Sequence, residues 1–180
     1  MQAQLNKALS ILKKGGIILY PTDTIWGLGC DATNSKAVAK IYSIKKRVNN
    51  KALISLVANK NQLQRHTIVN MPKTKNKLPT TFIYPKVTGL ASNLLAENNS
   101  AGIRIVKDKF CKELIQLLGK AIVATSANIS GITTPKQFTE ISDEIKKNVD
   151  YIVNLRQNEL MSTASTIIII NNDGSLKKIR

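Results

Sequence analysis

Short apolar runs alternate with amphipathic stretches along most of this 180-residue chain. The runs have the length of buried strands, and the amphipathic stretches place apolar residues three and four apart, as one helix face requires. This alternation predicts an α/β domain. The expected strands are residues 17–20, 52–57, 80–84, 102–106, 121–125, 151–153, 166–170 and 176–180, and the expected helices are 4–14, 35–46, 61–66, 90–96, 109–118 and 138–147.

The last two expected strands are joined by Asn-Asn-Asp-Gly at residues 171–174, which is typical of a tight hairpin turn. A terminal hairpin favours a mixed sheet over a purely parallel one. The sequence contains no internal repeat and no linker-like stretch. We therefore predict a single domain over residues 1–180, built as a twisted open mixed sheet with flanking helices.

Two expected strands end in polar loops that contain glycine. Residues 121–123 lead into Ala-Thr-Ser-Ala-Asn-Ile-Ser-Gly at 124–131, and residues 17–20 lead into Pro-Thr-Asp-Thr-Ile-Trp-Gly-Leu-Gly at 21–29. Open α/β sheets bind ligands at the carboxyl ends of their strands. Hydroxyl and amide groups at such an end suit phosphate, carboxylate and ribose oxygens. The alternative is a pair of polar turns whose Ser and Asn side chains act as caps.

The chain carries 27 Lys and Arg against 11 Asp and Glu, a formal net charge of +16. A positive field of this size is typical of proteins that contact nucleic acid. Aromatic residues make up only 4% of the chain, which argues against a platform for stacking single-stranded bases. Contact with the backbone or shape of structured RNA fits better, and a solvated basic surface is the alternative.

Several classes of enzyme are excluded by residues that the sequence lacks. His66 is the single histidine and is expected at the surface, so no Ser-His-Asp triad is available. Cys30 and Cys111 are not spaced as a metal pair and are expected to be free thiols. The chain has no phosphate-binding P-loop, no dinucleotide glycine fingerprint, no signal peptide and no apolar run of eighteen residues, and we expect a cytoplasmic protein without a membrane partner.

Four short motifs, taken together in this order, resemble the threonylcarbamoyl-adenylate synthase family, also called YrdC-like, with its YciO-type relatives. The motifs are Pro-Thr-Asp-Thr at 21–24 with Gly-Leu-Gly at 27–29, Lys-Lys-Arg at 45–47 as a Lys-x-Arg, Ser-Ala-Asn-Ile-Ser-Gly at 126–131, and more weakly Ser165-Thr166. The resemblance implies a YrdC-like fold and a nucleotidyltransferase that makes L-threonylcarbamoyl-adenylate and pyrophosphate from L-threonine, bicarbonate and ATP. Other tRNA-modification proteins would then move the threonylcarbamoyl group to an adenosine of tRNA.

The resemblance also implies roles for individual residues. The expected catalytic residues are Lys45, Arg47, Ser126 and Asn128, which would hold the ATP phosphates. The expected ATP-binding residues are Arg47, Lys51, Ser100, Ser126, Thr134 and Arg180, and the expected threonine-binding residues are Thr24, Arg104, Ala124 and Ser165. ATP chemistry implies Mg²⁺ held mainly by the phosphates, with Asp23 as an outer carboxylate or a turn cap and no protein metal site.

Arg104 also stands out without the resemblance. It lies in the middle of an apolar expected strand, and a buried arginine requires an anionic partner. The resemblance makes that partner the threonine carboxylate. The alternative is an arginine on the outward face of the strand.

The chain departs from the family pattern at three places. The usual Trp-Pro-Gly-Pro-Leu-Thr segment survives only as Leu-Pro-Thr-Thr at 78–81. Lys-Ala-Leu at 51–53 stands where the family has Asn-Pro-Leu, and Leu56 aligns with a family histidine that contacts threonine. These changes affect the expected amino-acid specificity, and they leave the expected triphosphate site largely intact. They keep two alternatives open: a YciO-type relative that uses another carboxylate or amino acid, and a non-catalytic protein that binds double-stranded RNA or tRNA.

Overall fold

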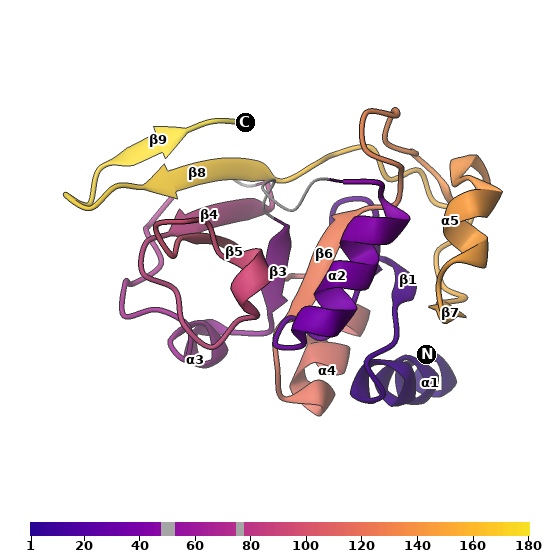
Figure 1. The fold of residues 1–180 in the computed structure, drawn as a ribbon. Coiled ribbons are helices and arrows are strands. Elements are labelled where there is room, and N and C mark those ends of the chain that lie inside the picture. Colours follow the sequence, from indigo (N-terminus) through magenta and orange to yellow (C-terminus); the bar gives the residue numbers. More distant parts are fainter. Residues whose placement is uncertain (48–52, 75–77) are drawn as a thin grey trace.

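The structure is a computed structural model that describes residues 1–47, 53–74 and 78–180. Among these residues, nine strands form one sheet in the order β7-β1-β2-β6-β3-β5-β4-β8-β9 (Figure 1). The strands are Ile18–Pro21 (β1), Trp26–Gly29 (β2), Ile54–Val57 (β3), Thr80–Tyr84 (β4), Ala101–Ile105 (β5), Ile122–Ser126 (β6), Tyr151–Ile152 (β7), Thr166–Ile170 (β8) and Leu176–Lys178 (β9). The helices are Gln2–Lys13 (α1), Ser35–Ile44 (α2), Lys60–Leu63 (α3), Lys109–Leu118 (α4) and Asp143–Lys147 (α5), with 3₁₀ turns at Ser92–Leu94 (η1) and Phe138–Glu140 (η2).

The sheet is mixed, as predicted. Strand β3 is parallel to β5, β4 to β8 and β1 to β7, and the other neighbouring pairs are antiparallel. Strands β8 and β9 form the expected terminal hairpin, which extends away from the helices (Figure 1). The prediction of an α/β fold with a mixed open sheet is confirmed.

Helices cover both faces of the sheet and bury its apolar side chains. Helices α1 and α4 pack together on one face, where Leu5, Leu12 and Leu114 are fully buried. Helix α2 covers the opposite face with Val38 and Ile41. Burying each of these side chains contributes roughly 1.5–3 kcal/mol.

Some of the expected inward-facing residues are placed differently. In α4 the buried residues are Phe110, Cys111, Leu114 and Ile115, whereas Leu117, expected to face inward, is half exposed. Leu117 lies at the margin of the helix face that Cys111, Leu114 and Ile115 turn to the core, so it is only partly covered. The expected helix over 138–147 is broken at Ile141, and α5 starts afresh from a Ser142 cap.

Strand β2 was not predicted, because its sequence, Trp-Gly-Leu-Gly, is more typical of a loop than of a strand. Two glycines lower strand propensity, but here close packing requires them. A Cβ at Gly29 would lie 2.5 Å from the Tyr20 ring and 2.9 Å from the Val123 carbonyl oxygen. The polar loop after β1 is therefore a four-residue turn, 22–25, between two antiparallel strands.

His66 was expected at the surface, and that prediction was wrong. Its ring is only 6% exposed, and Nδ1 lies 3.0 Å from the Thr88 carbonyl oxygen. A carbonyl only accepts, so Nδ1 donates, and the histidine ties two loops together. Cys30 and Cys111 are buried free thiols, as predicted. No helix in the described ranges is both long enough and apolar enough to span a bilayer.

Candidate active site

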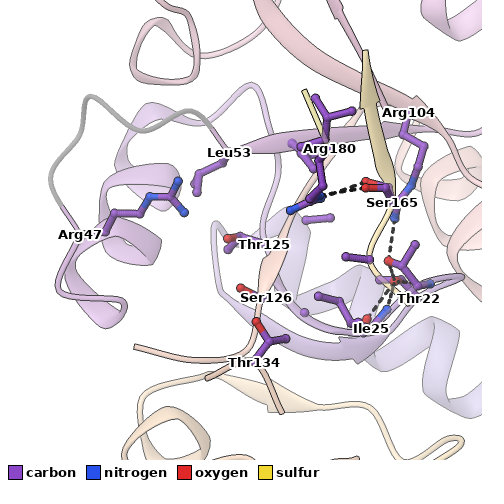
Figure 2. Close-up of a pocket in the computed structure, with 16 residues that line it drawn as sticks. Thr22, Ile25, Arg47, Leu53, Arg104, Thr125, Ser126, Thr134, Ser165 and Arg180 are labelled. Atoms are coloured by element: carbon purple, nitrogen blue, oxygen red, sulfur yellow. Dashed lines mark hydrogen bonds between the residues drawn. The ribbon is translucent and has the colours of Figure 1, made fainter. Parts of the chain in front are cut away.

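A pocket of about 240 Å³ lies where the β1–β2 turn, the end of β6, the start of β3 and the segment before β8 meet. Figure 2 shows its side chains converging from these segments, with Arg47 on one side, Arg104 on the other and Arg180 between them. The lining residues are Thr22, Thr24, Ile25, Gly27, Arg47, Leu53, Ile54, Arg104, Ala124, Thr125, Ser126, Thr134, Ala164, Ser165, Ile167 and Arg180.

The sheet topology explains this convergence. Strand β2 runs antiparallel to β6, with Gly27 opposite Ser126, so the β1–β2 turn lies beside the polar end of β6. Strand β3 pairs with the other edge of β6, with Ile54 opposite Ala124. The two polar loops that the sequence singled out therefore meet at one end of the sheet. A Cβ at Gly27 would lie 3.0 Å from the Thr125 carbonyl oxygen, so this junction is tightly packed.

Arg104 is the most buried charged group in the pocket, with 3% of its surface exposed. Its Nη2 lies 2.9 Å from Asp23 Oδ1 and 3.3 Å from Thr24 Oγ1. The alternative of an outward-facing arginine is thereby excluded. The anionic partner within the chain is Asp23, which also accepts the backbone N–H of Lys107 at 3.1 Å. Asp23 thus anchors the arginine as well as its own turn.

Arg180 and Ser165 form a second polar group in the pocket. Arg180 Nε donates to the Ser165 carbonyl at 3.0 Å, and its Nη2 lies 3.4 Å from the Ser165 hydroxyl. That hydroxyl is also 3.0 Å from Thr81 Oγ1. Partial burial lowers the pKa of Arg180, and the positive charge of Arg104 lowers it further. An anion placed between the two guanidinium groups would relieve this repulsion.

Lys45 is placed differently from the expectation that it faces the phosphates. It is only 1% exposed and does not line the pocket. Its ammonium donates to the carbonyl oxygens of Ser126 and Asn128 at 2.5 and 2.6 Å, while its own carbonyl accepts the Ser130 N–H at 2.9 Å. Burial and the nearby charge of Arg47 lower its pKa from 10.5 to about 8. Lys45 therefore fixes the 126–130 loop from behind.

The other expected nucleotide residues fall into three groups. Arg47, Ser126 and Thr134 line the pocket. Asn128 does not, because its amide nitrogen donates to the Ile129 and Ile132 carbonyls within its own loop. Ser100 lies in a separate turn, where its N–H donates to Asn98. Lys51 lies outside the described residues.

The expected threonine residues Thr24, Arg104, Ala124 and Ser165 all line the pocket. Leu56 does not line it. It is fully buried in the apolar cluster beneath α1 and α4, although it pairs in register with Arg104.

Several lining residues were not singled out by the sequence. Thr22, Ile25, Leu53, Ile54 and Ile167 complete the pocket wall. Thr22 belonged to a quoted motif, but the apolar residues carried no signal, because burial against a ligand and burial in the core look alike in a sequence.

The charged side chains of the described pocket wall are all positive. Three arginines contribute to it, and no carboxylate appears among the described residues that line the pocket. Elsewhere in the described ranges, no three His, Cys, Asp or Glu side chains gather as a metal site. Asp23 is engaged with Arg104, so these residues do not fit a protein-held Mg²⁺.

This arrangement describes an α/β protein with a cationic pocket suited to a small anionic ligand. Comparison with known proteins identifies the family. Residues 10–180 match the family model Sua5_yciO_yrdC, described as "Telomere recombination". The chain belongs to the Sua5/YciO/YrdC family, which confirms the resemblance drawn from its motifs.

Curated relatives align with most of the chain. "Threonylcarbamoyl-AMP synthase" of Pseudoalteromonas translucida is 30% identical over 160 residues, which are 84% of this chain and 86% of the relative. "Putative threonylcarbamoyl-AMP synthase" of Methanocaldococcus jannaschii is 35% identical over 181 residues, covering 96% and 84%.

Solved structures share the fold at lower identity. Sua5 of P. abyssi complexed with L-threonine matches with a TM-score of 0.83 and 23% identity, over 98% of this chain and 53% of that one. The chain thus spans about half the length of Sua5. YciO of E. coli matches with a TM-score of 0.83 and 24% identity, over 100% and 89%.

Proposed function

We propose that this protein makes L-threonylcarbamoyl-adenylate and pyrophosphate from L-threonine, bicarbonate and ATP. The observation that carries the proposal is a pocket in which three arginines and several hydroxyls converge without a lining carboxylate among the described residues. Such a wall favours a ligand with several negative charges. Curated relatives that align over most of their own length bear the name of this enzyme, which favours this reaction over other anion chemistry.

In this proposal the amino acid occupies the end of the pocket formed by Thr24, Arg104, Ala124 and Ser165. Arg104 is anchored by Asp23 and supplies positive charge for the amino-acid carboxylate. Apolar atoms of Ala124 and Ile167 border the same space and suit a short side chain. The small volume favours a small amino acid over a large one.

The nucleotide phosphates occupy the opposite end, near Arg47, Ser126 and Thr134, with Arg180 between the two ends. Arg47 is half-buried and directed into the pocket, where a guanidinium can hold two phosphate oxygens at once (Figure 2). Lys45 adds positive charge from behind the 126–130 loop. A cavity of about 240 Å³ is smaller than the roughly 300–1,000 Å³ typical of whole-ligand pockets, so the nucleoside extends toward solvent.

The chemistry then proceeds in two balanced steps. The threonine amine and bicarbonate combine to a carbamate and release water. A carbamate oxygen attacks the α-phosphorus of ATP, the bond from that phosphorus to the bridging oxygen breaks, and pyrophosphate leaves. The protein contributes positioning of the reactants and neutralisation of the charge on the phosphates.

The remaining expectations belong to the same proposal. The product serves threonylcarbamoyl-adenosine modification of tRNA in the cytoplasm, together with other modification proteins. The net charge of +16 supports contact with tRNA or double-stranded RNA through phosphates. Such binding should weaken steeply as salt rises, and an RNA complex that is insensitive to salt would contradict this part of the proposal.

The test is to identify the product by mass spectrometry. Protein, ATP, L-threonine and ¹³C-bicarbonate should give threonylcarbamoyl-adenylate that is one mass unit heavier than the product from unlabelled bicarbonate. Omitting any substrate should abolish the signal. A nucleotide product that lacks the label, or product formation without threonine, would overturn the proposal and favour a relative with another substrate.

A further inference from the structure

Thr22 has an unusually crowded hydroxyl for a turn residue. The side chain is 2% exposed at the pocket wall. Its Oγ1 lies 2.9 Å from the Ile25 carbonyl oxygen, 3.1 Å from the Thr24 backbone nitrogen and 3.3 Å from the Ile25 backbone nitrogen. It also lies 2.9 Å from Thr24 Oγ1. These contacts fix the direction of every hydrogen bond around it.

A hydroxyl has one proton to donate. The Ile25 carbonyl can only accept, so the Thr22 proton points to that oxygen. In the contact between the two hydroxyls, Thr24 must therefore be the donor and Thr22 the acceptor. The Thr24 proton is thus turned away from the ligand. Arg104 Nη2, 3.3 Å away, also donates to Thr24 Oγ1 and reinforces this direction.

We propose that Thr22 is a positioning residue that makes Thr24 a pure hydrogen-bond acceptor toward the pocket. Thr24 then selects a donor group of the ligand, either the amine or the side-chain hydroxyl of the amino acid, and repels carboxylate oxygens. The carboxylate is thereby directed to Arg104. The inference rests on the proposed function, because it concerns how the amino acid is oriented.

A simpler role for Thr22 is to cap the turn through the two backbone N–H groups. That role predicts a general loss of stability when the hydroxyl is removed. The positioning role predicts a specific loss of discrimination between ligands. The two are separated by measuring affinities for ligands that differ by one donor group.

The experiment measures dissociation constants by calorimetry for L-threonine, 2-aminobutyrate and 3-hydroxybutyrate. 2-Aminobutyrate lacks the side-chain hydroxyl, and 3-hydroxybutyrate lacks the amine. One of the two analogues removes the donor that meets Thr24, and wild type should prefer threonine over that analogue. In Thr22→Val the Thr24 hydroxyl is free to rotate and donate, so this preference should fall about tenfold, the value of one hydrogen bond.

Three further variants accompany Thr22→Val. Thr22→Ser retains the hydroxyl and should restore the wild-type preference. Thr88→Val makes the same chemical change at an exposed site away from the pocket wall and should change nothing. ATP affinity should stay constant throughout. Thr24→Val removes the acceptor while leaving the Thr22 turn bonds, and it should lose the same preference even if Thr22→Val folds poorly.

The outcomes separate the two proposals. Absence of threonine binding by wild type would overturn the proposed function and this inference with it. Threonine binding with an unchanged preference in Thr22→Val or in Thr24→Val would overturn the inference alone. An equal loss of ATP affinity in Thr22→Val would show that Thr22 acts only as a turn cap. Failure of Thr22→Ser to restore the preference would show that the hydroxyl does not carry it, and would overturn the inference.

Discussion

Replacing Lys45 by methionine tests whether its buried ammonium is charged at neutral pH and supports the pocket. Methionine has similar length and no charge. In the described structure, Lys45 forms no ion pair with a carboxylate, and two backbone carbonyls receive its protons. Its neighbour Lys46 provides a matched control, because it is exposed and pairs with Glu144 at 2.7 Å.

The magnitude follows from the pKa. Burial and Arg47 lower the Lys45 pKa from 10.5 to about 8. Between these two pH values the unfolded chain holds a proton that the folded chain has lost, so folding stability rises with pH. The gain is about 1.4 kcal/mol per pH unit, or about 3 kcal/mol over the window. Below pH 8 the charged lysine carries this cost in full. Lys45→Met lacks the group and should show no such rise.

The assay is urea unfolding of wild type, Lys45→Met and Lys46→Met at several pH values from 7 to 10. Subtracting the stability of Lys45→Met from that of wild type isolates the Lys45 contribution. We expect this difference to move in favour of wild type as pH rises above 8. Lys46→Met controls for the loss of a lysine at the neighbouring exposed position. The ATP affinity of wild type should fall over the same range, because the ammonium behind the 126–130 loop is lost. A flat stability difference would refute the reasoning.

Three further predictions concern stability. Leu56→His places an imidazole in a fully buried apolar cluster and should lower the free energy of unfolding in urea by about 2–4 kcal/mol. It should not improve threonine-dependent pyrophosphate release. An unchanged urea midpoint would contradict this prediction. Asp23→Asn leaves the buried Arg104 without its counter-charge and should lower the free energy of unfolding, measured in urea, by about 3–5 kcal/mol. Asp143→Asn at an exposed position is the control. Equal losses of stability in the two variants would contradict a stabilising role of the Asp23–Arg104 ion pair. Gly29→Ala brings a Cβ against the Tyr20 ring and should lower the stability by about 1–3 kcal/mol, measured by thermal unfolding. Gly102→Ala is the control, because its Cβ would make only ordinary van der Waals contacts. A Gly29→Ala variant as stable as wild type would contradict the prediction and show that the sheet adjusts to the added methyl group.

The sequence predicted the parts of the fold that depend on period and length. Strands 80–84 and 166–170 and helix 109–118 have the expected bounds, because apolar spacing alone specifies them. Strand β2 escaped prediction because its two glycines serve close packing between β1 and β6, and that packing is visible only in three dimensions. The single domain over 1–180 stays a prediction.

Some site residues could likewise be predicted from the sequence and others could not. Arg104 was recognised because a charge in an apolar strand is anomalous anywhere. The reversed position of Lys45 was not foreseeable, since a motif does not show whether an ammonium points to a ligand or to carbonyls. Ser100 fell outside the pocket because an alignment position says nothing of a turn's direction. The roles of Arg47, Ser126, Thr134 and the other lining residues remain predictions.

The most direct test of the central claim is pyrophosphate release from ATP by wild type, Arg47→Ala and Arg65→Ala. Arg65 is an exposed arginine that does not line the pocket and controls for loss of charge. We predict release that requires L-threonine and bicarbonate together, persists in Arg65→Ala and is lost in Arg47→Ala. Release that is independent of threonine, or that survives in Arg47→Ala, would contradict the assignment of this pocket to threonylcarbamoyl-adenylate synthesis.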